Sequence, residues 1–189
     1  FKDNELLTIG IDMPVVLDDS IPREADRMAR TLLGKKASSI FTAPSSQMLY
    51  QATYEAACQF SKQNFGKSIS IQSWHLFPKI KDVQTVIHHE QLTMYEIHPE
   101  LSFRAMNNNE VIRESKKTSI GFLMRKRLLE KHFLTLDFKA IRTEYLKKNV
   151  ADDDILDALA VLWSTQRVAD KQATFLPDQP LKPNMRIAY

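Results

Sequence analysis

The chain has 189 residues, of which 43% are hydrophobic and 26% charged, with a net charge of +3, four glycines and eight prolines; these values exclude a disordered or low-complexity protein. The single cysteine, Cys58, excludes an internal disulfide and any zinc site built on four cysteines or on two cysteines and two histidines. No apolar run approaches the ~20 residues that cross a bilayer and no basic-then-apolar leader is present, so we expect a reducing, cytoplasmic location and no membrane partner.

The first half of the chain predicts one strand followed by helices. Residues 6–12 alternate apolar side chains and run toward Pro14, which cannot donate to a sheet, and this is typical of a strand. Asp12 therefore stands at the carboxyl end of a strand, where open α/β sheets place their ligands. Helices are expected from Ser20 or Pro22 to near Gly34, over 47–63 and over 70–81.

The second half predicts another strand and several helices. Residues 94–98 alternate in polarity before Pro99, so Glu96 and His98 share one face of this strand. Residues 83–89 fit either a helix or a strand. Because strands alternate with helices and nothing resembles a repeat or a linker, we expect one α/β domain over residues 1–189. The remaining expected elements are helices over 102–106, 116–131, 138–148 and 152–168 and a strand over 185–189.

Carboxylates gather at three places along these elements. They lie at the end of the first strand (Asp12), on and just after the second strand (Glu96 and Glu100), and on the first turns of the last long helix (Asp153, Asp154 and Asp157). Crowded carboxylates repel one another and favour a bound cation, and their hard oxygens suit Mg2+ or Mn2+. Two such ions about 4 Å apart activate water and stabilise a leaving oxygen in phosphodiester cleavage.

Several of these polar residues also have simpler interpretations. Asp152 and Asp153 at the start of a helix are typical of capping residues that complement the helix dipole. His98 fits a general base, a metal ligand or a hydrogen-bonded structural histidine. Arg23, Asp26 and Arg30 share a helix face, which indicates an ion-pair network first and the rim of a site second.

Positive charge is concentrated in residues 104–148. This segment holds twelve lysines and arginines and five acids, a charge of +7, which leaves −4 for the rest of the chain. A basic segment beside an acidic one suits a nucleic acid held near a cation site, and a solvated helical face is the alternative. The residues expected to contact a nucleic-acid backbone are Lys79, Lys116, Lys117, Arg125 and Arg127.

Eight motifs, spread over nearly the whole chain, resemble a family of unknown function (family 429) that is described as predicted RNase H-like nucleases, and they occur in the family's order. The motifs are IGIDMP at 9–14, READRMAR at 23–30, SSIFTAP at 38–44, QSW at 72–74, PKI at 78–80, YEIHPELSF at 95–103, SKKT at 115–118 and DDILDAL at 153–159.

The resemblance implies an RNase H-like fold, which is a mixed sheet with helices on both faces. It also implies that acids on strands and on a late helix hold Mg2+ or Mn2+ for a nuclease reaction. By position, Asp12 looks like the acid of a later strand of that fold, and Asp154 and Asp157 look like the acids of its helix. Glu96 or Glu100 matches the second acidic motif of the family.

The sequence departs from the family's pattern at two places. The family opens with a strand that bears its own Gly-x-Asp, whereas this chain begins with Phe1 and runs quickly into the strand that ends at Asp12. We therefore expect the N-terminal strands, on the order of 30–50 residues, to be missing. Val16 stands where the family prefers glycine.

Three functions are consistent with these features. The first is a metal-dependent nuclease that uses Asp12, Glu96, Asp154 and Asp157. The second is a nucleic-acid-binding protein that keeps the fold without the chemistry. The third, a small-molecule phosphotransferase or phosphohydrolase, is disfavoured because the four glycines are scattered and form no phosphate-binding loop. No feature of the sequence indicates which oligomeric state the protein adopts.

Overall fold

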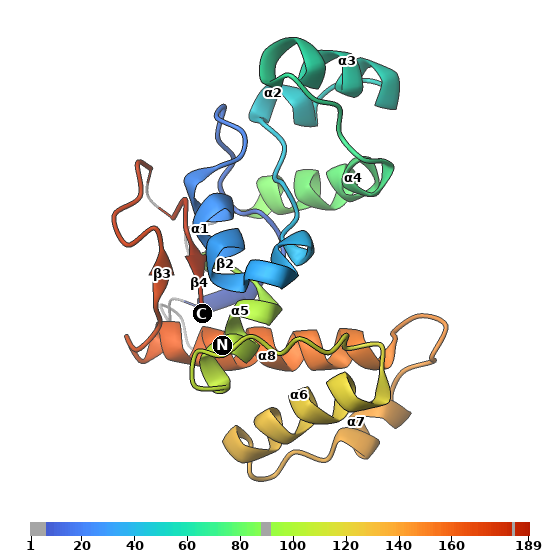
Figure 1. Cartoon of the computed structure of the whole chain (residues 1–189), viewed down its shortest axis with the longest axis vertical. Helices are drawn as coiled ribbons and strands as arrows, with labels where there is room; N and C mark the ends of the chain where they lie inside the picture. The colour runs from blue at the N-terminus through green and yellow to red at the C-terminus, as the bar shows by residue number, and fades with distance from the viewer. Residues whose placement is uncertain (1–6, 88–91, 183) are drawn as a thin grey trace.

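The computed structural model describes residues 7–87, 92–182 and 184–189. Within them a mixed four-stranded sheet has the order β1-β2-β4-β3 (Figure 1), which confirms the predicted α/β class. β1 and β2 are parallel, β2 and β4 are parallel, and β3 is antiparallel to β4. The strands are β1 (Leu7–Ile11), β2 (Leu92–Ile97), β3 (Phe175–Leu176) and β4 (Ile187–Ala188).

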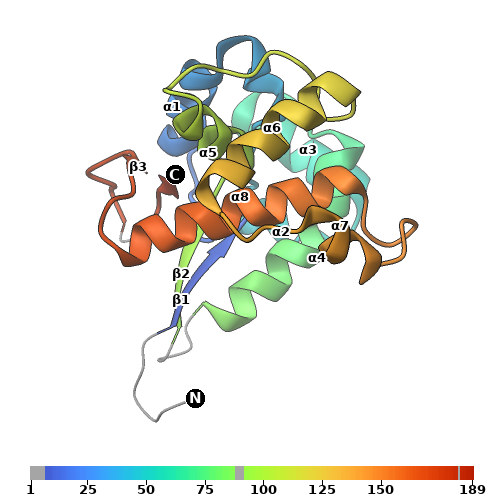
Figure 2. The same cartoon turned by 90° about the horizontal axis from the view of Figure 1, so that it is seen from below.

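A glycine lets the longest helix, α8 (Asp152–Ala169), approach β1 closely. A Cβ atom at Gly10 would lie 2.0 Å from Thr165 Oγ1 on α8 and 2.4 Å from Ile97 Cδ1 on β2. Figure 2 shows β1 and β2 side by side, close to α8. The position of α8 relative to the end of β1 therefore depends on the missing side chain at Gly10.

Helices cover both faces of the sheet, as predicted. Side chains alternate along a strand, so Gly10 and Ile97 face α8 whereas Glu96 points to the opposite face. There α1 (Glu24–Leu33) packs its buried Ala29 and Leu33 in a cluster that includes Ile187 of β4. The alternation predicted for residues 94–98 thus assigns Glu96 to the side of the sheet where α1 begins.

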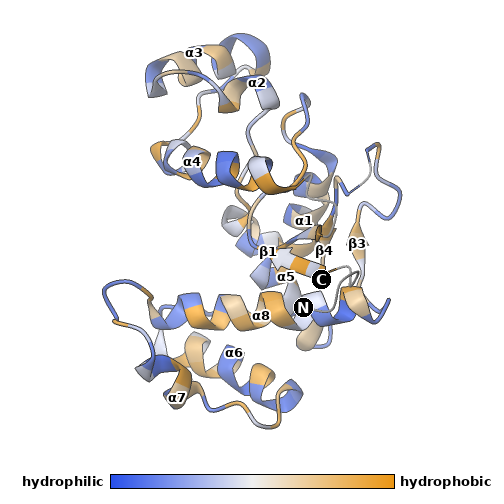
Figure 3. Cartoon of the chain, turned by 180° about the vertical axis from the view of Figure 1, so that it is seen from behind, coloured by the Kyte–Doolittle hydropathy of each residue, from blue (hydrophilic) through white to orange (hydrophobic). Residues whose placement is uncertain are grey.

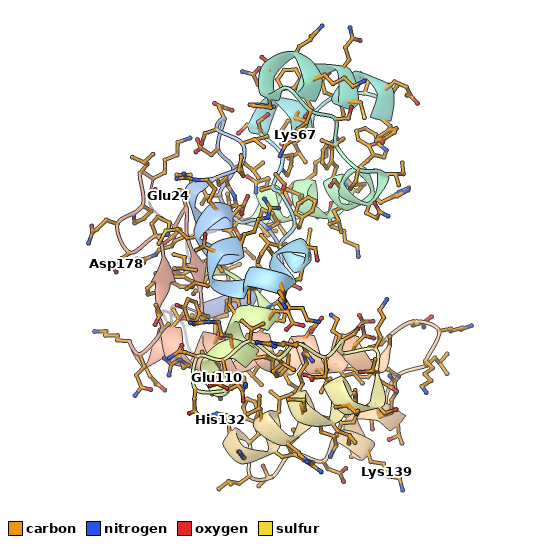
Figure 4. All side chains as sticks on the ribbon, viewed as in Figure 1. Glu24, Lys67, Glu110, His132, Lys139 and Asp178 are labelled. Atoms are coloured by element: carbon orange, nitrogen blue, oxygen red, sulfur yellow. The ribbon has the colours of Figure 1, made fainter. Side chains whose placement is uncertain are left out.

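The other helices form two groups at opposite ends of the long axis. The axis runs from the group near Lys67 to the group that contains Lys139 (Figure 4). The first group follows the 3-10 helix η1 (Gly34–Ser39) and contains α2 (Ser46–Leu49), α3 (Tyr54–Phe65) and α4 (Ile71–Val86). The second group, packed around α8, contains α6 (Ser119–His132) and α7 (Phe138–Thr143), whereas α5 (Pro99–Met106) lies between α1 and α8 (Figure 1).

The second group has its own apolar core. Leu156 and Ala160 of α8 are fully buried against Phe103 of α5 and Leu129 of α6. Hydrophobic and hydrophilic residues alternate along α8 (Figure 3), as expected of a helix that is buried on one side. None of the helices in the described ranges combines the length and the hydropathy that a bilayer span requires.

The predicted helix over 47–63 is divided in two. α2 ends at Leu49, and α3 begins at Tyr54 because the Thr53 hydroxyl caps it by accepting a hydrogen bond of 3.1 Å from the N–H of Ala56. The predicted helix over 70–81 continues through Pro78 to Val86, so residues 83–86 are helical. Residues 88 and 89 lie outside the described ranges.

Later elements also differ from the prediction. α6 begins at Ser119 rather than at residue 116, because the Thr118 hydroxyl caps it through the N–H of Gly121. α7 ends at Thr143, five residues before the predicted end. The two-residue strand β3 was not predicted, since its length is too short for a periodic pattern.

Candidate functional site

A cleft of about 260 Å3 opens at the carboxyl ends of β1 and β2. Its walls combine residues that follow these strands with residues from α1, η1, α4, α8 and the loop before α6. Its polar lining residues are Asp12, Asp26, Ser39, Glu96, His98, Glu100, Lys116 and Asp157. The cleft thus lies where the pattern of the first strand predicts a ligand site.

Asp12 and Asp157 are brought together at this cleft from β1 and α8. Asp12 follows β1 directly and lies two positions after Gly10, so alternation directs it to the face that α8 covers. Both residues line the cleft, and both also line a groove of about 630 Å3 between β1 and α8. Two carboxylates that are 145 positions apart in the sequence therefore line the same cleft and the same groove.

Both carboxylates are difficult to ionise, chiefly because the surrounding protein desolvates them. Desolvation raises the pKa of Asp12 to about 7, with a smaller contribution from the negative charge of Asp157, although Asp12 as a whole residue is exposed. Burial also raises the pKa of Asp157 to about 6, despite the opposing effect of Lys116. One oxygen of Asp157, Oδ1, is buried without a hydrogen-bond partner among the described groups.

Lys116 supplies the positive charge beside this acid pair. Its ammonium group forms an ion pair with Asp157 Oδ2 and lies 3.9 Å from Asp153 Oδ2. Burial works against the charge on Lys116, but Asp157 and Asp153 outweigh it and raise the pKa of the lysine. The lysine is therefore a charged, partly buried counter-ion within the cleft.

Tight packing holds the loop that carries Lys116. A Cβ atom at Gly121 of α6 would lie 2.2 Å from the carbonyl oxygen of Ser115. Arg125 Nη1 donates a hydrogen bond of 3.0 Å to the carbonyl oxygen of Glu114. The backbone before Lys116 is thus fixed against α6, and the flexible side chain alone reaches the acids.

Glu96 does not have the free carboxylate that a metal ligand requires. Arg23 donates to both of its oxygens, from Nη2 at 2.6 Å and from Nη1 at 2.8 Å, and the N–H of Val15 donates at 3.2 Å. Arg23 also pairs with Asp26 at 2.7 Å, as predicted, whereas Arg30 donates instead to the carbonyl oxygen of Ile40 and to the Thr42 hydroxyl. Burial raises the pKa of Glu96, and Arg23 opposes that rise. In this structure Glu96 is thus engaged in a buried ion network, and the catalytic and metal-binding role expected for it stays a prediction.

Glu100 and Arg125 hold each other in the same way. Arg125 Nη2 donates to the two carboxylate oxygens of Glu100 at 2.7 and 2.8 Å. Arg125 is fully buried, with its guanidinium carbon 5.5 Å from the ring centroid of Phe103. Arg125 is therefore not at the surface, where a phosphate contact was expected, and Glu100 is engaged by this arginine, so its metal-binding role stays a prediction. The buried Leu128 and Leu129, three and four residues later, are the sequence signal for this orientation.

The acids at the start of α8 have three different surroundings. Asp154 is exposed, lines the groove beside β1 and accepts a hydrogen bond of 2.8 Å from the N–H of Ala151. It therefore acts as the cap that was expected of Asp152 and Asp153. Asp153 faces Lys116, and Asp152 pairs with Arg142 at 3.1 Å. Only Asp157 of this helix lines the cleft.

His98 is held by one ring nitrogen. Nε2 lies 3.1 Å from the carbonyl oxygen of Ser39, and because a carbonyl only accepts, the proton is assigned to Nε2. Burial lowers the pKa of His98, so the ring is neutral at pH 7. Nδ1 then carries a lone pair and is buried without a partner among the described groups. The histidine has the predicted structural hydrogen bond and keeps one acceptor beside the cleft.

A second depression, of about 780 Å3, adjoins the cleft and is lined by lysines. It lies between the start of α6 and the loop before α8, and Lys116 belongs to both cavities. The sequence interpretation assigned Lys116 and Lys117 to the site but missed Lys147 and Lys148, which the chain fold brings to the same place. We call this depression the lysine groove; its basic lining residues are Lys116, Lys117, Lys147 and Lys148.

The two other predicted phosphate-binding residues lie outside the lysine groove. Lys79 is exposed on α4, three residues after Leu76 of the cleft wall. Arg127 is exposed on α6. The structure therefore groups the predicted basic residues only in part.

The donor set fits one divalent cation better than two. In the part of the chain that the structure describes, no three His, Cys, Asp or Glu side chains are placed together as metal ligands. Among the described residues, the cleft carboxylates that no arginine binds are Asp12 and Asp157, and Asp157 is paired with Lys116 through one oxygen only, whereas Glu96 and Glu100 are bound by arginines. Mg2+ is commonly held by one or two protein carboxylates, with waters and substrate phosphate as its other ligands. The unpartnered Oδ1 of Asp157 beside Asp12 suits such a site.

The chain belongs to the family described as "Protein of unknown function (DUF429)", whose model matches residues 2–182. This match confirms the family predicted from the motifs. A search of curated proteins found no match. A search of solved structures found none either.

Proposed function

We propose that this DUF429 protein is a metal-dependent nuclease that hydrolyses phosphodiester bonds at the cleft beside Asp12 and Asp157. The observation that carries the proposal is the pairing of these two carboxylates, whose pKa values rise to about 7 and about 6. Desolvated carboxylates of this kind destabilise the folded state when they are ionised, and a bound cation relieves that cost. Proteins retain strained charges of this kind mainly where they are used.

Asp12 and Asp157 would hold one Mg2+ or Mn2+ ion. When bound, such an ion lowers the pKa of a coordinated water and stabilises negative charge on a phosphoryl group. Glu96 and Glu100 contribute indirectly, because their arginine pairs fix the end of β2 and the start of α5 beside the cleft. The proposal thus differs from the four-carboxylate, two-ion site that the sequence alone suggests.

The lysine groove supports a nucleic acid as the substrate. Lys117 and Lys148 are exposed and have no ion-pair partner among the described residues, and Lys147 lies 3.5 Å from Asp152 at the rim. Lysines of this kind contact phosphates without reading sequence. Since the groove meets the cleft at Lys116, a backbone bound in it would lead toward Asp12 and Asp157.

A nucleic-acid-binding protein without catalytic activity is the second candidate. The observation that favours it is the absence, within the described ranges, of a ready group of three metal-binding side chains. This candidate predicts binding that weakens steeply with salt, because lysine–phosphate contacts release counter-ions. It also predicts no cleavage at any metal concentration.

The test uses single-stranded, duplex, hybrid and branched nucleic acids in Mn2+. The proposal predicts cleavage by the wild-type chain and its loss in Asp12→Asn and Asp157→Asn. Asp154→Asn is the matched control, since it removes a charge from the same turn of α8 and keeps an oxygen that caps the helix. Equal cleavage by Asp12→Asn would contradict the proposal. Binding without cleavage by every protein would favour the second candidate.

A further inference from the structure

We propose that Lys116 is a displaceable counter-ion, which neutralises Asp157 in the empty cleft and moves to a substrate phosphate when one enters from the lysine groove. Metal and substrate would then bind cooperatively, because Asp157 becomes fully available to a cation only when the polyanion is present. This inference rests on the proposed function and adds to it a means of coupling metal occupancy to substrate.

The first basis is the position of the ammonium group. It forms an ion pair with Asp157 Oδ2 and lies 3.9 Å from Asp153. A divalent cation at Asp157 would therefore compete with Lys116 for the same carboxylate. The other oxygen, Oδ1, has no hydrogen-bond partner among the described groups, so it is available to coordinate a cation.

The second basis is that Lys116 lines both cavities. It belongs to the wall of the cleft and to the wall of the lysine groove, and 29% of its side chain is exposed. A phosphate held by Lys117 and Lys148 would add negative charge on the groove side of the ammonium group. Attraction toward that phosphate opposes the attraction toward Asp157 and so favours movement of the ammonium group toward the groove.

The third basis is that the side chain moves more readily than its surroundings. The backbone before Lys116 is fixed by the close approach of Ser115 to Gly121. The four-carbon stem of a lysine is flexible and carries a compact charge. The nearest arginine on α6, Arg125, is held by Glu100 and cannot replace the lysine. Displacement therefore requires rotamer changes in one residue only.

Coupling between two binding sites is reciprocal, and the factor by which one ligand changes the affinity for the other usually falls within a known range. If a phosphate backbone tightens the binding of a cation, the cation tightens the binding of the backbone by the same factor. Couplings between two sites are typically about 5- to 150-fold. We expect a value within that range for a chain whose competing charge is a single lysine.

The test measures the Kd of Mn2+ from the electron paramagnetic resonance signal of the free ion. Wild-type protein, Lys116→Gln and Lys117→Gln are titrated with and without a single-stranded oligonucleotide whose phosphorothioate linkages resist hydrolysis. We expect the oligonucleotide to tighten Mn2+ binding by at least about fivefold in the wild type. Without the oligonucleotide, Lys116→Gln should bind Mn2+ about as tightly as the wild type does with it. Adding the oligonucleotide to Lys116→Gln should change the affinity little. Lys117→Gln, which loses the same charge from an exposed position, should resemble the wild type in the absence of oligonucleotide.

The failures of the two proposals are distinguishable. Mn2+ binding that Asp12→Asn abolishes, but that Lys116→Gln leaves unchanged or weakens, would overturn the role of Lys116 and leave the metal site intact. No binding of Mn2+ by the wild type, with or without oligonucleotide, would overturn the metal site and this inference together. If Lys116→Gln does not fold, the wild-type titrations decide, because an Mn2+ affinity that the oligonucleotide does not change contradicts the coupling.

Discussion

Arg23 and Glu96 are joined by two hydrogen bonds, of 2.6 and 2.8 Å, although 73 positions separate them in the chain. The pair links the start of α1 to the end of β2 on the side of the sheet opposite α8. It engages a carboxylate at the edge of the cleft, whereas Asp12, which follows the neighbouring strand, has no hydrogen-bond or ion-pair partner among the described residues. Four predictions follow from this division between structural and free acids.

Glu96→Gln should lower the free energy of unfolding without removing the metal site. Breaking a buried ion pair leaves an uncompensated charge and costs roughly 3 kcal/mol. Here Asp26 still neutralises part of the charge on Arg23. Urea denaturation measures the loss. Glu24→Gln is the control, since its 4.0 Å pair with Arg27 is exposed and contributes little. A stable Glu96→Gln protein that no longer binds Mn2+ would instead identify Glu96 as a ligand.

Asp12→Asn should stabilise the protein at pH 8 in the absence of metal, by on the order of 1 kcal/mol once exposure to solvent is allowed for. Folding raises the pKa of Asp12 from 3.8 to about 7, so between these values the folded state binds more protons than the unfolded state. The stability of the wild type therefore falls as pH rises through this window. Asn has no such dependence.

Thermal denaturation in a chelating buffer from pH 4 to pH 8 checks this prediction. The advantage of Asp12→Asn should be complete above about pH 7 and should vanish near pH 4. An advantage that is constant with pH would show that the carboxylate is not under strain. Added Mn2+ should reverse the order at pH 8, because only the wild type gains stability from the ion.

Mn2+ affinity should decrease as pH falls below about 7. A carboxylate must lose its proton before it binds a metal, and the pKa values of Asp12 and Asp157 are raised to about 7 and about 6. Calorimetric titration should therefore show proton release on binding at pH 6.5 and much less at pH 8.5. An affinity that is unchanged between pH 5 and pH 8 would exclude these two carboxylates as the ligands.

Gly10→Ala should move α8 away from β1 and weaken metal binding. The added methyl group would meet Thr165 Oγ1 at 2.0 Å and Ile97 Cδ1 at 2.4 Å, so we expect a loss of about 1–3 kcal/mol in stability. Because α8 carries Asp157, its shift changes the distance to Asp12. Mn2+ affinity and urea denaturation, measured on the same protein, test both effects.

Gly34→Ala is the matched control for this variant. Gly34 has a φ of 51° and no atom within 4 Å of an added Cβ, so alanine strains only the backbone at the end of α1. It should lose stability and keep its affinity for Mn2+. Equal loss of Mn2+ binding in both proteins would show that general destabilisation, rather than the position of α8, is responsible.

The sequence predicted those parts of the site that depend on local patterns. Asp12 at a strand end, the alternation around Glu96 and the acids on the first turns of α8 all follow from residue spacing. The partners of Glu96 and Glu100 could not be predicted, because they lie 73 and 25 positions away and depend on tertiary packing. For the same reason the lysine groove, which joins Lys117 to Lys148, was found only in part.

Anomalous diffraction at the manganese absorption edge, from crystals grown with Mn2+, locates the metal ion itself. We expect one strong peak between the carboxylates of Asp12 and Asp157, and its loss in Asp12→Asn crystals. A peak coordinated by Glu96 or Glu100, or no peak at the cleft in crystals that contain Mn2+, would contradict the site proposed here.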